Sequence, residues 1–504
     1  MSALLVLLVM GPVALTGLAA LTGWRPALPW LGVGTDAGVL VAGCWLATRS
    51  LHHAPASGLS GLLRVDSLSA FMVVVIGSIS LLAATYGVRY LDGEMSRQRC
   101  SPRHAAAYCV LVQLFVGTML LAVLAANIGV LWVAVEATTI TTTFLVGHRR
   151  TRGSLEASWK YVVICSVGVA VAFLGTVVVY LAAVHAGGHS LNALTWTWLT
   201  AHASSLNPGV MRLAFSLLVF GYGAKVGLVP MHSWLPDAHS QAPAPVSALM
   251  SGVLIAVAFY ALLRFKAIAD VAIGTAYPRA MFVVVALLSL GLAAALLLTQ
   301  RDYKRMLAYH SIEHMGLIAL GTAAGGPLAI AGVLLHILGH GLAKGVLFLT
   351  SGEILLVEET SDMASISGLI ARRPALGALF SFGLIALLGL PPFSLFTSEL
   401  TMLRGELASG LGWAAAASLA LMVVIFAAVA THARHLLLGE GAGRANSPAH
   451  AAGAGVVTGE ATSASTPRSV TAPLVAGLMA CVVFGVAAWP LADLLHAAAH
   501  VVAR

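Results

Sequence analysis

The stretch AANIGVLWVAVEATTITTTFLVG, residues 125–147, contains a single charged side chain, Glu136. A helix that crosses about 30 Å of hydrocarbon needs roughly 20 mostly apolar residues. The stretch therefore predicts a membrane-spanning helix, and Glu136 is expected near the midplane of the bilayer because it lies in the middle of the stretch. Similar apolar runs recur on both sides of it along nearly the whole chain.

Composition extends this prediction to the rest of the protein. Of the 504 residues, 59% are hydrophobic and 9% are charged, whereas soluble proteins carry about 25% charged residues. These values exclude a soluble fold and indicate an all-α polytopic membrane protein. The net charge of +8 comes from scattered basic residues with no basic, aromatic-interleaved patch, so no nucleic-acid partner is expected.

Clusters of charge, proline and glycine divide the chain into about fourteen predicted spans. Pro230 is expected to break the seventh span, and Pro391 with Pro392 the twelfth, because proline lacks an N–H and clashes with the preceding turn. The first twenty residues carry no Lys or Arg and are interpreted as a retained span, not a cleaved signal peptide. The predicted span centres are residues 12, 40, 77, 115, 137, 171, 221, 254, 288, 313, 339, 387, 424 and 482.

Four parts are expected along the chain. Residues 1–104 form helices 1–3, residues 105–266 a first repeat of helices 4–8, residues 278–438 a second repeat of helices 9–13, and residues 439–504 a polar loop and helix 14. Arg and Lys concentrate in the odd-numbered loops, which predicts that these loops face the cytoplasm. Both termini are therefore expected outside the cell, in a multi-pass protein of a prokaryotic plasma membrane.

Charged groups inside the spans are candidates for function, because each costs about 2.5 to 3.5 kcal/mol on insertion scales. Lys225 lies within residues 215–249, beside the expected break at Pro230, where free carbonyls must be satisfied by water or protein. A Lys at this place suits ion transfer together with Glu136. The alternatives are a Glu136 that caps a helix or pairs statically with a Lys, and a Lys225 that snorkels to the surface.

The eleventh span, AGVLLHILGHGLAKGVLFLTSGE, places His336, His340 and Lys344 at i, i+4 and i+8. These intervals put three titratable groups on one helical face, about 6 Å apart per step, which suits a water-bridged relay. A metal site is the alternative, but no Glu stands between the two histidines as in H-E-x-x-H and no third ligand is apparent. We therefore expect no metal.

Two further spans carry titratable groups. Residues 300–320 place His310, Glu313 and His314 within one turn, deeper than a set of interfacial charges at a helix end would lie, whereas Lys304 fits that simpler interpretation. Glu399 follows the predicted break in the twelfth span.

The order of these features suggests a repeat. An acidic helix followed two spans later by a proline-broken helix bearing Lys225 is matched, five spans on, by the His314 helix and the broken helix bearing Glu399. An odd offset reverses the direction of crossing, so two inverted five-helix repeats with broken helices 7 and 12 are predicted, as in ion-coupled transporters.

Six long motifs occur in order along the chain: NIGVLWVAVEATTITTTFLVG, SLEASWKYVVICSVGVAVAFLGT, GAKVGLVPMHSWLPDAHSQAPAPVSALMSG, DYKRMLAYHSIEHMG, HILGHGLAKGVLFLTSG and LGLPPFSLFTSE. They resemble the proton-conducting antiporter-like subunits shared by complex I, Mrp-type cation/proton antiporters and membrane-bound group 4 hydrogenases. The V-E-A-T-T stretch with S-L-E-A-S-W-K-Y is most similar to component F of hydrogenase-4. The resemblance spans roughly residues 60–440.

The resemblance implies proton-transfer roles for matching positions. Glu136 and Lys225 fall on the family's glutamate and lysine of helices 5 and 7, whose opening and closing is thought to drive proton release. The eighth span departs from the family pattern, since it has no Lys or His in its middle and only Ser247 and Ser251 as polar groups. The full set of expected proton-transfer residues is Glu136, Lys225, His314, His336, His340, Lys344 and Glu399, with His239, His310, Glu313 and Lys304 as weaker members.

The implied function is that of a proton-translocating subunit in a multisubunit redox-driven complex, either a membrane-bound group 4 hydrogenase or a formate hydrogenlyase-like complex related to complex I. Expected partners are other antiporter-like and anchor subunits, a peripheral hydrogenase or redox module, and the lipid bilayer.

No NAD, flavin, nickel or cluster motif is legible, and the five cysteines (Cys44, Cys100, Cys109, Cys165 and Cys481) lie far apart without a C-x-x-C. We expect no cofactor and no redox chemistry in this chain, with nickel–iron and iron–sulfur centres in its partners. The alternatives are a subunit of a cation/proton antiporter or other ion-driven transporter without a redox partner, and a non-conducting membrane anchor.

Overall fold

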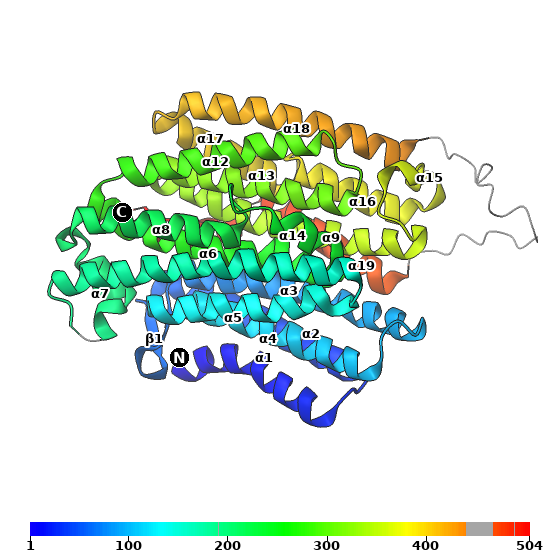
Figure 1. Cartoon of the computed structure of the whole chain (residues 1–504), viewed down its shortest axis with the longest axis horizontal. Helices are drawn as coiled ribbons and strands as arrows, with labels where there is room; N and C mark the ends of the chain where they lie inside the picture. Colours follow the sequence, from blue (N-terminus) through cyan, green and yellow to red (C-terminus); the bar gives the residue numbers. More distant parts are fainter. Residues whose placement is uncertain (190, 440–466, 488, 504) are drawn as a thin grey trace, which may run out of the picture.

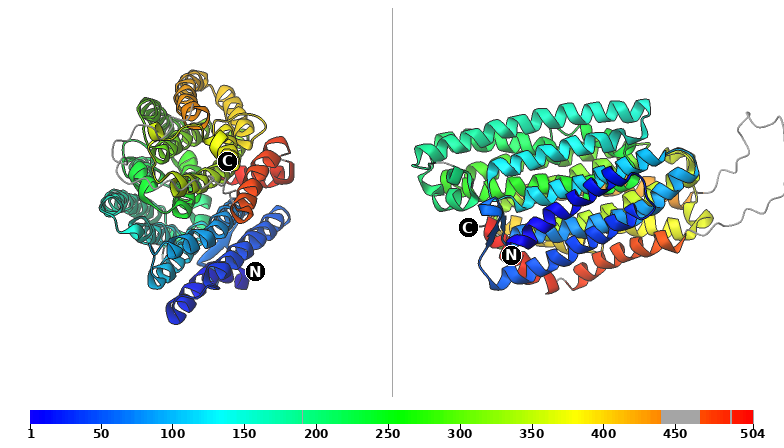
Figure 2. Two further views of the ribbon diagram at one scale, coloured as in Figure 1. Left: turned by 90° about the vertical axis from the view of Figure 1, so that its right-hand side faces the viewer. Right: turned by 90° about the horizontal axis from the view of Figure 1, so that it is seen from below.

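A computed structural model describes residues 1–189, 191–439, 467–487 and 489–503. Its helices run roughly parallel to one long axis, which Figure 1 shows horizontally and Figure 2 shows in two further views. Twelve of the helices in the described part of the chain are long and apolar enough to cross a membrane. The predicted polar loop lies almost wholly outside the described residues.

The described secondary structure is nearly all helical. A short antiparallel pair of strands, β1 (Ala56–Gly58) and β2 (Leu63–Val65), precedes the third helix. The helices are α1 (Ser2–Thr22), α2 (Leu28–His52), α3 (Ser67–Ser96), α4 (Pro102–Leu124), α5 (Ile128–Val146), α6 (Arg152–His185), α7 (Trp196–Ala201), α8 (Pro208–Val226), α9 (Trp234–Gln241), α10 (Ala244–Leu249), α11 (Ile255–Ile273), α12 (Ala276–Leu297), α13 (Tyr303–Ala324), α14 (Gly326–Glu358), α15 (Leu369–Arg372), α16 (Pro374–Leu387), α17 (Ser394–Ala408), α18 (Gly412–Leu438), α19 (Arg468–Val486) and α20 (Trp489–Val502).

The predicted spans agree with these helices. Every predicted centre falls within a helix, and the eighth falls at residue 254, where a π-helical turn (Met250–Leu254) joins α10 to α11. The all-α polytopic fold is thus confirmed. The total of fourteen spans, the division into four parts and the inverted repeat stay predictions.

Both predicted helix breaks are present. α8 ends at Val226, where Gly227 adopts a left-handed φ of 86°, and the chain resumes as α9 beyond Pro230. The indole N–H of Trp234 donates to the carbonyl of Ala224 at 2.8 Å, which satisfies one acceptor at the end of α8. The second break separates α16 from α17 and contains Gly389, with a φ of 63°.

Small residues bring α6 and α8 into close contact. A Cβ added at Gly221 of α8 would lie 2.3 Å from the backbone nitrogen of Ala172, and one added at Gly168 of α6 would lie 2.4 Å from the Cβ of Ala224. Neither position has room for a side chain. Small residues at helix interfaces let backbones approach in membranes, and here they position the end of α8 that bears Lys225 against α6.

α14 occupies the centre of the bundle. It packs against α3, α10, α13, α16, α17, α19 and α20, and its side chains from Ala329 to Ile354 are buried. The residues that the sequence places on this helix are therefore enclosed by protein and do not face lipid.

The two ends of the bundle differ in charge. The arginine-rich loops that follow α3 and α5 lie at one end, and α7, β1 and both chain termini lie at the opposite end (Figure 1, Figure 2). The termini thus share a side of the membrane. Their outward orientation stays a prediction.

Candidate functional site

Lys225 is fully buried near the end of α8. Its ammonium group donates to the hydroxyl of Thr139 on α5 at 2.8 Å and to the phenol of Tyr161 on α6 at 2.6 Å. The same nitrogen lies 4.9 Å from the centre of the Tyr161 ring, a cation–π distance. Lys225 is therefore held inside the protein and does not snorkel to the surface.

Glu136 lies in the middle of α5 and contacts the same cluster. Its carboxylate accepts hydrogen bonds from Thr139 at 3.3 Å and from Ser166 of α6 at 3.1 Å. No ion pair joins Glu136 to Lys225 among the described residues. Thr139 lies between the two charged groups and bonds to both, so the acid and the base are linked through one hydroxyl.

Tyr161 connects this cluster to the break after α8. Its phenol contacts the hydroxyl of Thr142, and its ring lies 5.0 Å from the ring of Trp234 in an edge-on arrangement. Trp234 also bonds to the carbonyl of Ala224, the residue before Lys225. A movement of the broken helix would therefore displace Tyr161, which accepts a hydrogen bond from Lys225.

A second cluster of titratable groups lies between α13, α14 and α17. The ring nitrogens of His314 (Nδ1) and His336 (Nε2) are 2.8 Å apart, and the other nitrogen of His336 lies 2.9 Å from the hydroxyl of Ser398. Such a pair needs a proton on one of the two facing nitrogens. The three side chains form a continuous hydrogen-bonded row that ends one residue before Glu399.

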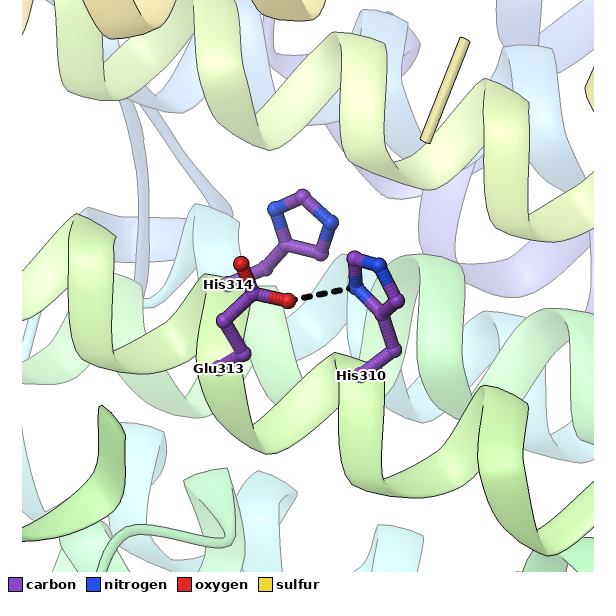
Figure 3. Close-up of side chains that lie close together, drawn as sticks. All are labelled: His310, Glu313 and His314. Carbon is purple, nitrogen blue, oxygen red and sulfur yellow. Dashed lines mark ion pairs between the residues drawn. The ribbon is translucent and has the colours of Figure 1, made fainter. Parts of the chain in front are cut away.

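His310 and Glu313 extend the row along α13. The imidazole Nδ1 of His310 lies 2.6 Å from a carboxylate oxygen of Glu313, as Figure 3 shows. The His310 ring stacks on the His314 ring with centres 4.8 Å apart. All three side chains are buried, which agrees with the prediction that they lie deeper than interfacial charges.

The three titratable groups of α14 all face α13. The rings of His336 and His340 lie 5.0 and 4.9 Å from the ring of His314, and the ammonium of Lys344 donates to the carbonyl of Leu307 on α13. The spacing-based prediction of a shared face is thus confirmed. Neither ring nitrogen of His340 has a described protein partner, and buried polar atoms of this kind are commonly satisfied by water.

Hydroxyls and one histidine fill the region between the two clusters. Ser251 of the π-helical turn lies 2.8 Å from Ser311 of α13, hydroxyl to hydroxyl. His239 of α9 stacks on Phe348 of α14 at 5.1 Å, and neither of its ring nitrogens has a described partner. Phe348 also lies 6.0 Å from the ammonium of Lys344.

Lys304 is buried at the arginine-rich end of α13. Its ammonium donates to the carbonyl of Ser240, in the last turn of α9, at 3.4 Å and to that of Ala242, just beyond the helix, at 3.5 Å. Its position near the helix end fits the simpler interpretation, although its burial shows that it is not a surface charge.

Glu399 opens onto a cavity of about 220 Å³ between α17 and α18. Glu406, two turns further along α17, and Ser418 of α18 line the same cavity. The carboxylate of Glu399 is close enough to Gly389 that a Cβ there would lie 2.3 Å from it. The break after α16 therefore leaves space for this carboxylate.

Two sets of three side chains bring possible metal ligands within 4.8 Å of one another: His310, Glu313 and His314, and His314, His336 and Glu399. In the second set both ring nitrogens of His336 already contact other side chains. Those contacts favour a hydrogen-bonded row over a metal site.

Sequence reasoning missed the uncharged members of both clusters. Thr139, Tyr161, Ser166 and Ser398 have no charge that would distinguish them from the many other hydroxyls of the chain. Glu406 was detectable, because it lies seven residues after Glu399 and so on the same face of one helix.

Comparison with known proteins identifies relatives of this chain. A family model described as "NADH:quinone oxidoreductase/Mrp antiporter, TM" matches residues 125–425. The chain is 39% identical over 349 residues to the hydrogenase-4 component F homolog of Methylacidiphilum infernorum, covering 68% of this chain and 72% of the relative. It is 32% identical to hydrogenase-4 component B of Escherichia coli over 77% of this chain and 56% of that protein, so it spans little more than half of component B.

Solved structures share the fold. A chain of the membrane-bound sulfane sulfur reductase, an archaeal respiratory membrane complex, superposes with a TM-score of 0.84 at 22% identity, covering 100% of this chain and 98% of the other. A chain of the Mrp complex from Dietzia sp. superposes with a TM-score of 0.83 at 22% identity and the same coverage. Both belong to multisubunit membrane complexes.

Proposed function

This chain belongs to the NADH:quinone oxidoreductase/Mrp antiporter family of membrane proteins, and from that membership we propose that it translocates protons as a subunit of a redox-linked complex of the hydrogenase-4 kind. Both sequence relatives described above are hydrogenase-4 components or their homologs. Redox centres, nickel–iron and iron–sulfur, belong to partner subunits in this proposal, and the membrane is the prokaryotic plasma membrane.

The observation that carries the proposal is the linkage of Lys225 to Glu136 through Thr139. The interaction between a buried ammonium and a carboxylate that are joined through one hydroxyl depends on the distance of each group from that hydroxyl. When Glu136 is drawn away or neutralised, Lys225 loses its nearest described negative charge and releases a proton more readily.

The released proton needs onward groups, and the described residues supply two kinds. Ser251 and Ser311 form a hydroxyl pair in the region where the eighth helix lacks a Lys or His. His239 lies beside Phe348, and its ring nitrogens have no partner among the described residues. Water bridging from either would reach Lys344 and the histidines of α13 and α14.

The outlet in this proposal is Glu399. The row His314, His336 and Ser398 leads to it by contacts of 2.8 and 2.9 Å, and beyond it lies the cavity shared with Glu406. Moving one charge against 100 mV requires about 2.3 kcal/mol, which corresponds to a change of less than two pKa units at the donor.

The test replaces Lys225 and, separately, Lys344 with methionine in the intact complex. Methionine keeps most of the length of the side chain and removes its charged end. We expect proton translocation in proteoliposomes, measured with a pH-sensitive dye while the redox reaction proceeds, to fall below about one tenth of the wild-type rate for each variant. Lys160→Gln is the control, because Lys160 forms only partly exposed ion pairs, with Glu156 and Asp237, and such pairs contribute little.

Two results would overturn the proposal. If both variants kept wild-type translocation, the chain would be an anchor that does not conduct. The fold is equally close to a chain of the Mrp complex, so the second candidate is a cation/proton antiporter subunit. That candidate would be supported if the chain purified without any redox module and if an imposed Na⁺ gradient alone drove proton movement.

A further inference from the structure

Two cavities share a wall at the arginine-rich end of the bundle. The first, of about 500 Å³, is lined by Arg99, Arg149 and Arg150 among other polar side chains; we call it the arginine cavity. The second, of about 570 Å³, lies between α4, α5 and α6 and is lined mainly by apolar side chains; we call it the apolar groove. His104, His148 and Arg150 line both.

The shared wall has an uncompensated positive charge. Glu94 and Glu359 line the arginine cavity, but no ion pair joins either of them to its three arginines in the described part of the chain. No acidic side chain lines the apolar groove. A phosphate group at the shared wall would meet Arg150 and two imidazoles, and guanidinium binds phosphate with paired N–H donors.

The groove itself offers a surface for hydrocarbon. Phe144 and Trp159 are 62% and 69% exposed, so they face the surroundings of the bundle. The hydroxyl of Ser158, which also lines the groove, donates to the carbonyl of Thr143 at 2.7 Å and needs no other partner. Tryptophan is enriched at the level of the lipid head groups, which is the depth that the arginine-rich end implies.

The two imidazoles of the shared wall and the backbone turn that carries Arg150 are held in place. His104 contacts the hydroxyl of Ser101 through Nδ1 at 3.0 Å, and the His148 ring lies 5.3 Å from that of Tyr108. The backbone N–H of Arg150 donates to the carbonyl of Gly147 at 3.0 Å and fixes the turn that carries the guanidinium. The wall is therefore formed before any ligand arrives.

We propose that these two cavities bind one anionic phospholipid, with its phosphate at Arg150, His104 and His148 and one acyl chain along Phe144 and Trp159. A positive wall adjoining an apolar groove at head-group depth matches an amphiphile with an acidic head, and basic pockets between transmembrane helices bind such head groups. The site shares no residue with the proton-transfer clusters, so this inference is independent of the proposed function.

The test is native mass spectrometry of the intact complex, released from nanodiscs that contain equal amounts of phosphatidylglycerol and phosphatidylethanolamine. We expect the wild type to retain phosphatidylglycerol preferentially. Arg150→Gln should reduce that retention about fivefold, since one arginine near the surface contributes about 1 kcal/mol to binding of acidic lipid. Arg103→Gln is the matched control, because Arg103 is an exposed arginine of the same region that lines neither cavity.

A second variant tests the hydrocarbon half of the site. Ala107 is exposed and lines only the apolar groove, so Ala107→Trp fills the groove and leaves every charge in place. We expect it to reduce lipid retention as much as Arg150→Gln does. If Arg150→Gln reduced retention, Ala107→Trp did not, and 10 mM inorganic phosphate displaced the lipid, the wall would bind a phosphate group alone with no acyl chain in the groove, and the lipid assignment would be overturned.

Two further outcomes would also overturn the proposed lipid site, and one of them needs no variant. Equal retention of the two lipids by the wild-type complex would exclude selection of an acidic head group. A photo-crosslinking amino acid at position 159 that labels another subunit instead of lipid would show that protein covers the groove.

Discussion

The two titratable clusters differ in how their members are connected. Around Lys225, the two charged groups never touch, and a single threonine hydroxyl bonds to both. Around His314, imidazoles contact one another directly, and His336 uses both ring nitrogens. The first cluster has one acid and one base, whereas the second has four histidines, a lysine and two glutamates.

This difference implies different tasks. A link through a single hydroxyl is lost when either partner moves out of hydrogen-bonding distance, so it suits a switch. A row of histidines accepts and passes protons at many points, because each imidazole has one donor and one acceptor when neutral, so it suits conduction. Three variants test this division of tasks.

The largest effect is expected from the conducting row. His336→Leu removes the central ring and the hydrogen-bonding contacts that join His314 to Ser398 through it. We expect proton translocation in the intact complex to fall about a hundredfold, the scale on which positioned acid–base groups act. His202→Gln, in an exposed loop, is the control, and more than half of the wild-type rate in His336→Leu would show that the row is not used.

An intermediate effect is expected at the switch. Thr139→Val keeps the shape of the side chain and removes the hydroxyl between Lys225 and Glu136, with an expected tenfold loss of translocation, since a hydrogen bond to a charged group contributes about 1.5 to 3 kcal/mol. Thr139→Ser should restore the wild-type rate. Thr141→Val is the matched control for Thr139→Val, because the described contacts of the Thr141 hydroxyl are to carbonyls of its own helix. An equal loss of translocation in Thr141→Val would attribute the effect to packing.

The smallest effect is expected between the clusters. Ser251→Ala removes one hydroxyl of the Ser251–Ser311 pair, and since His239 offers a parallel contact with water, we expect about a threefold loss of translocation. Ser80→Ala is the control, as its hydroxyl bonds to the carbonyl of Gly77 in the same helix. No change in Ser251→Ala, but a large loss in His239→Gln, would assign the connection to the histidine alone.

The fold could largely be predicted because apolar length and proline breaks are properties of the local sequence. The centres of the spans and the breaks at Pro230 and Pro391 needed no knowledge of packing. What the sequence could not show is the arrangement of helices around α14, since side chains that face protein and side chains that face lipid are equally apolar in a membrane.

The site could be predicted only where it is charged. The cost of burying charge singled out Lys225 and His314, and the spacing of His336, His340 and Lys344 placed these three on one helical face. The sequence could not predict that Thr139 lies between Glu136 and Lys225, because that contact depends on how α5, α6 and α8 pack. The close approach of Gly168 and Gly221 decides it, and glycine is common throughout this chain.

The central position of α14 has a consequence for how the protein enters the membrane. A newly inserted helix that carries two histidines and a lysine in its middle is poorly accommodated by lipid alone, yet every one of these groups is enclosed in the finished bundle. α14 must therefore leave the insertion machinery together with α13 or remain beside it until α16 and α17 emerge. Biogenesis of this protein should therefore depend on the time between the synthesis of α14 and that of α16 and α17. A pause in translation before α16 should increase degradation of the nascent chain.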